Sequence, residues 1–207
     1  MSLSLVVGAR PRTVDDGDLA RALVAGEAWA VAETWQRFAP MVLTMAQRSL
    51  GTRADAEEIA QEVFCSLFRK AKTLRDPWSL RSFVYSFAVR VVKAELRRRK
   101  VRGWFPFLRV ELPPDVGART LDLESRDLLK KLYALLDRLT PRDRMVFVLR
   151  RMESKTVDEI AAALDLSTST VKRSMAHASS RLSVWIDADP GLAALIRERR
   201  GGTWLET

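Results

Sequence analysis

Residues 156–182 combine two helical patterns with a tight turn, and they constrain the fold of this chain more than any other segment. Thr156 is a suitable N-cap, and Glu159 three positions later completes the pattern of a capping box. Apolar residues recur at helical spacing up to Leu164, and Ser167 is suited to cap a second helix. Helix, turn and helix have the right lengths together, so the segment predicts a helix–turn–helix.

The second predicted helix has two contrasting faces. Its apolar face consists of Val171, Met175, Ala178 and Leu182, and its opposite face consists of Ser169, Lys172, Arg173, Ala176 and Ser180. Small, hydroxyl and basic side chains on the front of a helix fit the major groove of duplex DNA. An ordinary helical hairpin with a hydrated polar face is the alternative, and the motif by itself indicates only DNA binding.

Charge and composition limit the partners of the chain. It has 207 residues, 47% of them hydrophobic, and a formal net charge of +9, which favours a polyanionic partner. No apolar run approaches the roughly 20 residues that span a bilayer, and the N-terminus lacks the pattern of a signal peptide. Cys65 and His177 are the only residues of their types, which excludes internal disulfides and a Cys/His zinc cluster. We expect a cytoplasmic protein with no membrane partner, metal or cofactor.

Helical spacing without convincing period-2 strands predicts an all-α fold of two small helical domains joined by a linker. The expected divisions are a tail (1–17), a first body (18–100), the linker (101–120), a second body (121–185) and a C-terminal extension (186–207). Asp189 and Pro190 open a short helix in the extension, whose Leu192, Leu195 and Ile196 require a partner surface. We expect that surface to be the second body or a regulator.

A helix predicted over residues 79–100 carries apolar residues on two nearly opposite sides. One side holds Leu80, Val84, Phe87, Val91 and Ala94, and the other holds Tyr85, Val89, Val92 and Leu96. A basic strip runs between them and consists of Ser82, Ser86, Arg90, Lys93, Arg97 and Lys100. Residues 90–109 hold eight basic side chains against one acid, Glu95, so local salt bridges cannot neutralise them. The strip favours a polyanion, with a solvated face as the alternative.

Aromatic residues next to this strip suit single-stranded DNA, whose bases stack on rings while cations follow the phosphates. Phe83 and Phe87 lie on or beside an apolar side and are better explained as core, which leaves Trp78 and Tyr85 as stacking candidates. The helix predicted over 54–70 is different, because its first half is acidic. Acids near a helix N-terminus favour the helix dipole, and an acidic face on a basic protein also suits docking of another protein.

Three segments of the chain together resemble one protein family. WQRFAPMVLTMAQRSLGTRADAEEIAQEVFCSLFR and LRSFVYSFAVRVVKAELRRRK resemble region 2 of the extracytoplasmic-function sigma factors, the small two-domain sigma subunits of bacterial RNA polymerase. LLDRLTPRDRMVFVLRRMESKTVDEIAAALDLSTSTVKRSMAHASSRL resembles region 4 of that family. The resemblance covers residues 18–185 and implies a sigma factor that binds core polymerase, recognises minus-thirty-five and minus-ten promoter elements and melts the promoter.

The resemblance also implies a role for each surface. The helix over 55–70 docks on the polymerase's largest subunit, through Asp55, Glu58, Gln61 and Glu62. The helix over 79–100 and the loop before it capture the unpaired minus-ten strand, through Trp78, Ser82, Tyr85, Ser86, Arg90, Lys93 and Arg97. The helix after Ser167 reads the minus-thirty-five duplex, through Thr168, Ser169, Lys172, Arg173, Ala176 and His177. Many relatives carry Asn at the position of Arg90 and often Asp at that of Ala94, which leaves the minus-ten base preference open.

Two other classes of function compete with this interpretation. A stand-alone helix–turn–helix regulator needs a dimer interface or an effector pocket, neither of which is evident, and it leaves the first body without a purpose. An enzyme needs clustered carboxylates or a nucleophile with its base, and His177 has no evident partner. We therefore expect no catalysis. Anti-sigma proteins are common partners in the family, and the sequence does not decide whether this chain has one.

Overall fold

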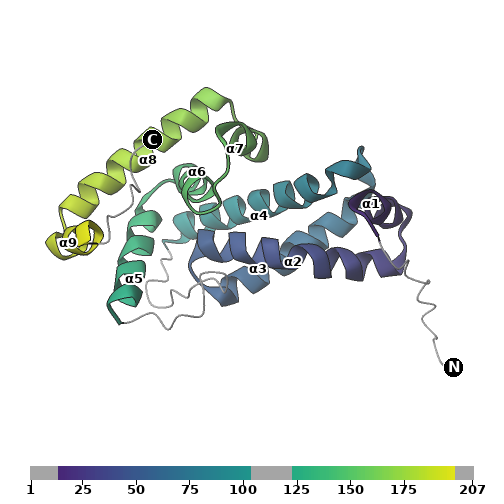
Figure 1. Ribbon diagram of the computed structural model, residues 1–207, viewed down its shortest axis with the longest axis horizontal. Helices are drawn as coiled ribbons and strands as arrows, with labels where there is room; N and C mark the ends of the chain where they lie inside the picture. The colour runs from purple at the N-terminus through teal and green to yellow at the C-terminus, as the bar shows by residue number, and fades with distance from the viewer. Residues whose placement is uncertain (1–13, 104–122, 199–207) are drawn as a thin grey trace.

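The computed structural model describes residues 14–103 and 123–198, and within these ranges the chain forms helices and no strand (Figure 1). The first body contains α1 (Asp16–Ala25), α2 (Ala28–Leu50), α3 (Arg53–Arg69) and α4 (Leu80–Arg102), with 3-10 turns η1 (Ala71–Thr73) and η2 (Pro77–Ser79) between α3 and α4. The second body contains α5 (Leu123–Arg138), α6 (Pro141–Arg151), α7 (Val157–Leu164), α8 (Thr168–Asp187) and α9 (Pro190–Glu198). The all-α expectation is confirmed.

Two differences concern the ends of the expected divisions. Helix α1 begins at Asp16, inside the segment predicted as a tail, because the side chain of Asp15 accepts a hydrogen bond from the backbone N–H of Asp18 and caps the helix. Helix α8 continues to Asp187, past the expected end of the second body. Most of the predicted linker lies outside the described residues.

Polar caps produce the predicted helix–turn–helix. The hydroxyl of Thr156 accepts a hydrogen bond from the backbone N–H of Glu159, whose carboxylate accepts one from the backbone of Thr156. Asp165 then takes a left-handed conformation with φ of 55°, which reverses the chain. The hydroxyl of Ser167 caps α8. The predicted capping box, turn and second cap are all confirmed.

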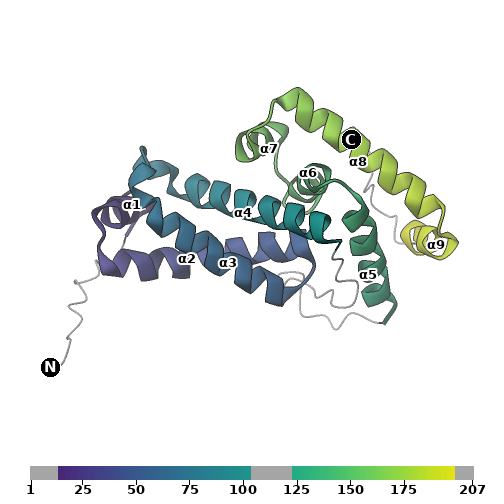
Figure 2. The same cartoon turned by 180° about the vertical axis from the view of Figure 1, so that it is seen from behind.

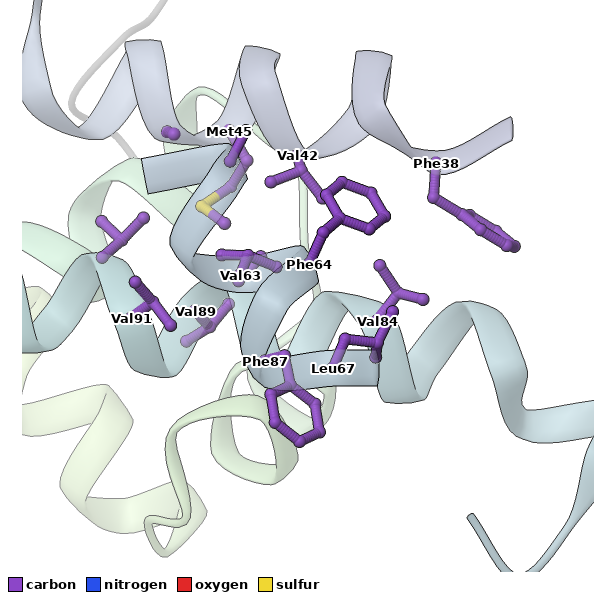
Figure 3. Packing of buried hydrophobic residues seen from close by; sticks show 14 of the residues in the cluster. Phe38, Val42, Met45, Val63, Phe64, Leu67, Val84, Phe87, Val89 and Val91 are labelled. Carbon is purple, nitrogen blue, oxygen red and sulfur yellow. The ribbon is translucent and has the colours of Figure 1, made fainter. Parts of the chain in front are cut away.

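The core of the first body lies where α2, α3 and α4 meet (Figure 3). Its fully buried large side chains include Phe38 and Met45 of α2, Phe64 and Leu67 of α3, and Leu80 of α4. Each such side chain contributes about 1.5–3 kcal/mol of hydrophobic stabilisation. This core holds α3 and α4 rigidly side by side, so the predicted docking and melting helices have a fixed relative position.

Helix α4 is covered on two sides, as predicted. Its buried residues include Leu80, Val84, Phe87 and Val91 on one side and Val89, Val92 and Leu96 on the other. Ala94 is exposed, contrary to the prediction, because α3 meets this end of α4 through ion pairs such as Arg98 with Glu62. The first apolar side therefore ends about one turn early.

The second apolar side of α4 is covered by helices of the second body. Helices α6 and α7 pack against α4, and α6 also contacts α2 (Figures 1 and 2). A single buried cluster includes residues of α4 together with Met145, Val146 and Leu149 of α6 and Ile160 and Leu164 of α7. Part of the second body thus belongs to the same hydrophobic cluster as the first body.

A second cluster joins α5, α6, α8 and α9. Its buried members are Tyr133, Leu136, Leu139, Phe147, Ala178, Leu182, Ile186, Leu192 and Ala193. Leu192 of the C-terminal extension is therefore covered by the second body, which is one of the two surfaces expected for it. The side chains of Leu195 and Ile196 lie outside the described residues.

Gly51 provides a test of the contact between the bodies. It ends α2 with φ of 93°, and an added Cβ would lie 2.9 Å from Cδ1 of Tyr133. Gly51→Ala should lower the free energy of unfolding by about 2–3 kcal/mol, from backbone strain plus the clash. Urea unfolding followed by circular dichroism measures this loss.

Gly26→Ala is the matched control, because Gly26 has φ of 82° and no atom near an added Cβ. It should lose only about 1 kcal/mol, from backbone strain alone. Equal losses of unfolding free energy in the two variants would show that the Tyr133 ring does not clash with a Cβ at position 51.

Candidate nucleic-acid interface

The predicted recognition face of α8 is open to solvent. Val171, Ala178 and Leu182 are buried against the second body, and the opposite face exposes Thr168, Ser169, Lys172, Arg173 and Ala176. Helix α8 lies along the outside of the molecule, away from the helices of the first body (Figure 1). Hydroxyl and cationic donors are therefore presented together on an accessible helix.

His177, the last predicted residue of this face, has a partner that the sequence did not reveal. Its Nδ1 lies 3.0 Å from Oδ2 of Asp143, a buried carboxylate at the start of α6 that also accepts a hydrogen bond from the Thr140 hydroxyl. The side chain of His177 stays 58% exposed. Asp143 thus orients the imidazole at the edge of the face without removing it from solvent.

The predicted basic strip of α4 is divided by the second body. Ser82, Arg90 and Arg97 are exposed, whereas Tyr85, Ser86 and Lys93 are half-buried. The Nζ of Lys93 donates a hydrogen bond to the Leu164 carbonyl of α7 at 3.5 Å. Burial lowers the pKa of Lys93, and the charges of Arg97 and Arg142 lower it further. One edge of the strip is therefore accessible and the other is covered.

Tyr85 lies on the covered edge. The Nζ of Lys155 lies 5.0 Å from the centroid of its ring, and its hydroxyl is buried with no hydrogen-bond partner among the described residues. Burial raises the pKa of this hydroxyl, and the charges of Glu153 and Glu159 raise it further. Tyr85 is thus not presented as a stacking platform in this arrangement.

Two cations near the end of α4 are neutralised, contrary to the prediction. Arg98 pairs with Glu62 at 3.1 Å and with Glu95 at 2.9 Å. Arg99, which is buried, pairs with Asp55 at 2.9 Å and with Glu95 at 2.8 Å. The count of charges within residues 90–109 missed these ion pairs, because two of the three acids lie on α3. Arg90 instead rests on the Phe87 ring, with Cζ 4.5 Å from its centroid.

The loop before α4 adds a recess to the accessible edge. Trp78 is 67% exposed in η2. A shallow hollow of about 310 Å³ lies between this loop and α4, and it is lined by Thr73, Leu74, Arg75, Asp76, Ser79, Ser82, Phe83 and Ser86. The sequence singled out the loop but not Thr73 and Arg75, because only the fold brings them beside Ser82.

The acidic side of α3 has two kinds of residue. Glu58, Gln61 and Glu62 are exposed. Asp55 is half-buried, accepts a hydrogen bond from the Thr52 hydroxyl and pairs with Arg99. Asp55 thus stabilises the start of α3 and its contact with α4, and the surface available to a partner is formed by the other three residues.

Within residues 14–103 and 123–198, no three His, Cys, Asp or Glu side chains gather as metal ligands. No helix in the described part is long and apolar enough to cross a bilayer.

Both bodies match known protein-family models. Residues 34–102 match Sigma-70 region 2, and residues 129–182 match Sigma-70, region 4. The two matches, in this order along an all-helical chain, define a transcription initiation factor of the sigma-70 class. We refer to α1–α4 as region 2 and to α5–α9 as region 4 below.

Curated relatives place the chain within that class. The ferric citrate uptake sigma factor FecI of Escherichia coli is 33% identical over 135 residues, which cover 63% of this chain and 76% of FecI. The ECF RNA polymerase sigma factor SigM of Mycobacterium tuberculosis is 26% identical over 168 residues, 81% of this chain and 83% of SigM. This chain belongs to the extracytoplasmic-function sigma factors of bacterial RNA polymerase.

A solved structure supports the fold. The structure of CnrH in complex with the cytosolic domain of CnrY matches with a TM-score of 0.58 and 23% identity, over 84% of this chain and 98% of that one. At this identity the likeness concerns the arrangement of helices alone.

Proposed function

We propose that this sigma factor acts through three separate surfaces. The exposed side of α3 docks on core polymerase, the accessible edge of α4 with the loop before it holds the unpaired minus-ten strand, and α8 reads the minus-thirty-five duplex. The observation that most strongly supports the proposal is the solvent-exposed face of α8, directly opposite its buried face. We assign no catalytic step to the chain. A stand-alone regulator is not favoured, because that role leaves region 2 unused.

Helix α8 suits duplex recognition through side chains at its N-terminal end. Lys172 and Arg173 offer charged donors to guanine edges or phosphates, and Thr168 and Ser169 offer hydroxyls to either partner of a base pair. Ala176 leaves room for close approach to a thymine methyl group. His177 is held by Asp143 at the flank, where a phosphate contact is the more natural role.

The accessible edge of region 2 suits a single strand. Trp78 offers a stacking surface, the hollow beside Ser82 and Ser86 offers a place for an unstacked base, and Arg90 and Arg97 offer charges to phosphates. Lys93 and Tyr85 lie on the covered edge and join this surface only when region 4 moves away. Docking of polymerase on Glu58, Gln61 and Glu62 leaves the accessible edge of α4 open to the DNA strand.

A regulatory protein, such as an anti-sigma factor, is the further partner that we propose. CnrH was solved with a second protein, the cytosolic domain of CnrY. Action on chromosomal promoters would place this chain in the cytoplasm.

Duplex reading is tested by replacing Lys172 and Arg173 separately with Ala. If the replaced residue reads a guanine edge, its loss should weaken binding by about 1–3 kcal/mol at one base pair. If it contacts phosphate, its loss should weaken binding to all sequences. Holoenzyme affinity for promoters with single substitutions in the minus-thirty-five element measures the difference. Unchanged promoter activity in both variants would remove α8 from the reading role.

Separate surfaces for melting and docking are tested by two charge reversals. Arg90→Glu with Arg97→Glu should block promoter opening and preserve affinity for core polymerase, because repulsion then replaces attraction at the phosphates. The variant with Glu58→Lys and Gln61→Lys should instead lose affinity for core polymerase, the step that precedes promoter opening. Permanganate footprinting and a polymerase-binding assay report the two steps.

The choice of residues in that test keeps both variants folded. All four side chains are exposed, and exposed substitutions usually change stability by within about 0.5 kcal/mol. Lys93 and Asp55 are left unchanged because each makes an internal contact. If the strip variant still opens DNA, or both variants fail equally in polymerase binding, the proposed separation is wrong.

A further inference from the structure

The carboxylate of Asp143 is buried where the start of α6 packs against α8. Asp143 is 2% exposed, and Thr140, the N-cap of α6, donates its hydroxyl to Oδ2 at 2.7 Å. The Nδ1 of His177 lies 3.0 Å from the same oxygen. The Nε of Arg142 lies 3.9 Å from Oδ1, near the outer limit of an ion pair. A buried carboxylate requires partners of this kind, because its removal from water is costly.

The contact with Asp143 fixes the orientation of the His177 ring. An ionised carboxylate only accepts hydrogen bonds, so the Nδ1 that faces it must carry the proton of the bond. Nε2 lies at the other edge of the ring, where no described residue is bonded to it. The side chain of His177 is 58% exposed, so a partner from solution can reach the ring. Nε2 is therefore the atom that this side chain presents to a partner.

The place of His177 along α8 indicates which partner Nε2 meets. His177 follows Arg173 by four residues, which places it one helical turn, about 6 Å, further along the same side of the helix. Residues at the N-terminal end of a recognition helix contact base edges, and residues further along the helix approach the DNA backbone. His177 also lies on the flank that faces α6. A backbone phosphate is therefore the partner that fits this position.

A phosphate requires the protonated form of His177. When Asp143 holds the proton on Nδ1, the neutral ring presents a lone pair at Nε2, and a phosphate oxygen repels that lone pair. The imidazolium presents an N–H at Nε2 instead. Its positive charge also gives Asp143 a closer cationic partner than Arg142. His177 is the only histidine of the chain, and histidine is the side chain type that changes its charge between about pH 5 and pH 8.

The charged groups around His177 act in opposite directions. Arg173 and Arg181 lie one turn to either side of it on α8, and they repel an imidazolium, as does Arg142 of α6. Asp143 attracts it. On the other helices packed against α8, the structure pairs Glu159 with Lys155, places Arg138 on the Trp185 ring and pairs Asp189 with Lys131. An added phosphate increases the attraction and favours the imidazolium.

We propose that Asp143 is a positioning residue for promoter binding, which presents the protonated ring of His177 to a backbone phosphate of the minus-thirty-five duplex. One proton then passes from solvent to Nε2 when DNA binds, and affinity for the promoter falls as the pH rises. Asp143 also stabilises the start of α6 through Thr140, but a helix cap alone gives no such pH dependence. The inference rests on the proposed reading of the duplex by α8 and adds one contact to it.

The phosphate contact is tested by salt titrations of promoter binding at about pH 6 and about pH 8. Holoenzyme with the unaltered chain should bind several-fold more tightly at the lower pH, on native and altered minus-thirty-five sequences alike. Its salt slope should be steeper there by about one, because one more phosphate is neutralised. His177→Gln should keep the shallower slope at both pH values, because the amide has no charge. His177→Arg should keep the steeper slope at both.

The positioning role is tested by Asp143→Asn in the same holoenzyme assay. This change keeps the size of the side chain and an oxygen that can accept from Thr140, but it removes the negative charge. The difference in slope and affinity between the two pH values should become smaller, while affinity for core polymerase stays unchanged. Thr140→Ala is the matched control, because it weakens the cap of α6 and leaves the charge of Asp143 in place. It should lower the free energy of unfolding and keep the pH dependence.

Nuclear magnetic resonance of the full-length free chain gives a readout without DNA. The single imidazole gives one set of ring ¹⁵N resonances, which belong to His177. In the neutral ring the proton should lie on Nδ1, as the contact with Asp143 requires. A neutral ring with its proton on Nε2 would contradict the orientation.

Three further results would overturn the inference. If the unaltered chain and His177→Gln show the same pH effect on the slope, His177 does not contact phosphate. If His177→Gln loses discrimination at a single base pair, His177 reads a base edge. If Asp143→Asn keeps the full pH dependence, Asp143 is only a helix cap. The proposed reading of the duplex is decided separately, by base discrimination in the Lys172 and Arg173 variants.

Discussion

The structure depends on a single helix that is buried from two directions. Helix α4 completes the core of region 2 with α2 and α3, and the same helix serves as the surface on which α6 and α7 pack. A helix of this kind has little solvent-exposed surface left, so its polar residues are confined to narrow strips. The position of region 4 therefore determines how much of α4 is available to a partner.

Ion pairing decides which cations of α4 remain available. Acidic residues of α3 form ion pairs with Arg98 and Arg99 near the C-terminal end of α4, and these pairs strengthen the contact between α3 and α4. Arg90 and Arg97 stay exposed. A count of charges along the sequence overstates the free positive charge, because the neutralising groups are close in space and distant in sequence.

Local features of this protein were predictable, whereas contacts between distant segments were not. The capping box of Thr156 and Glu159, the cap at Ser167 and the two apolar sides of α4 depend on residues within a few turns of one another. The partner of His177, the pairing of Asp55 and the hydrogen bond of Lys93 join residues separated by 34 to 71 positions. Such contacts follow from packing, which no helical periodicity encodes. The division of α4 into an accessible and a covered edge belongs to this second kind.

The shared core also makes the contact between region 2 and region 4 a unimolecular event. Both regions belong to one chain, so the populations with the regions joined and separated do not change when the protein is diluted, and a tethered segment competes at an effective concentration that can reach the millimolar range. A partner that separates the regions binds from solution, and its effect grows with its own concentration. The partner must also bind the separated form more tightly than the joined form, by at least the free energy of the contact. Contacts between the two regions therefore lower the apparent affinity of any partner that binds only when they are separated.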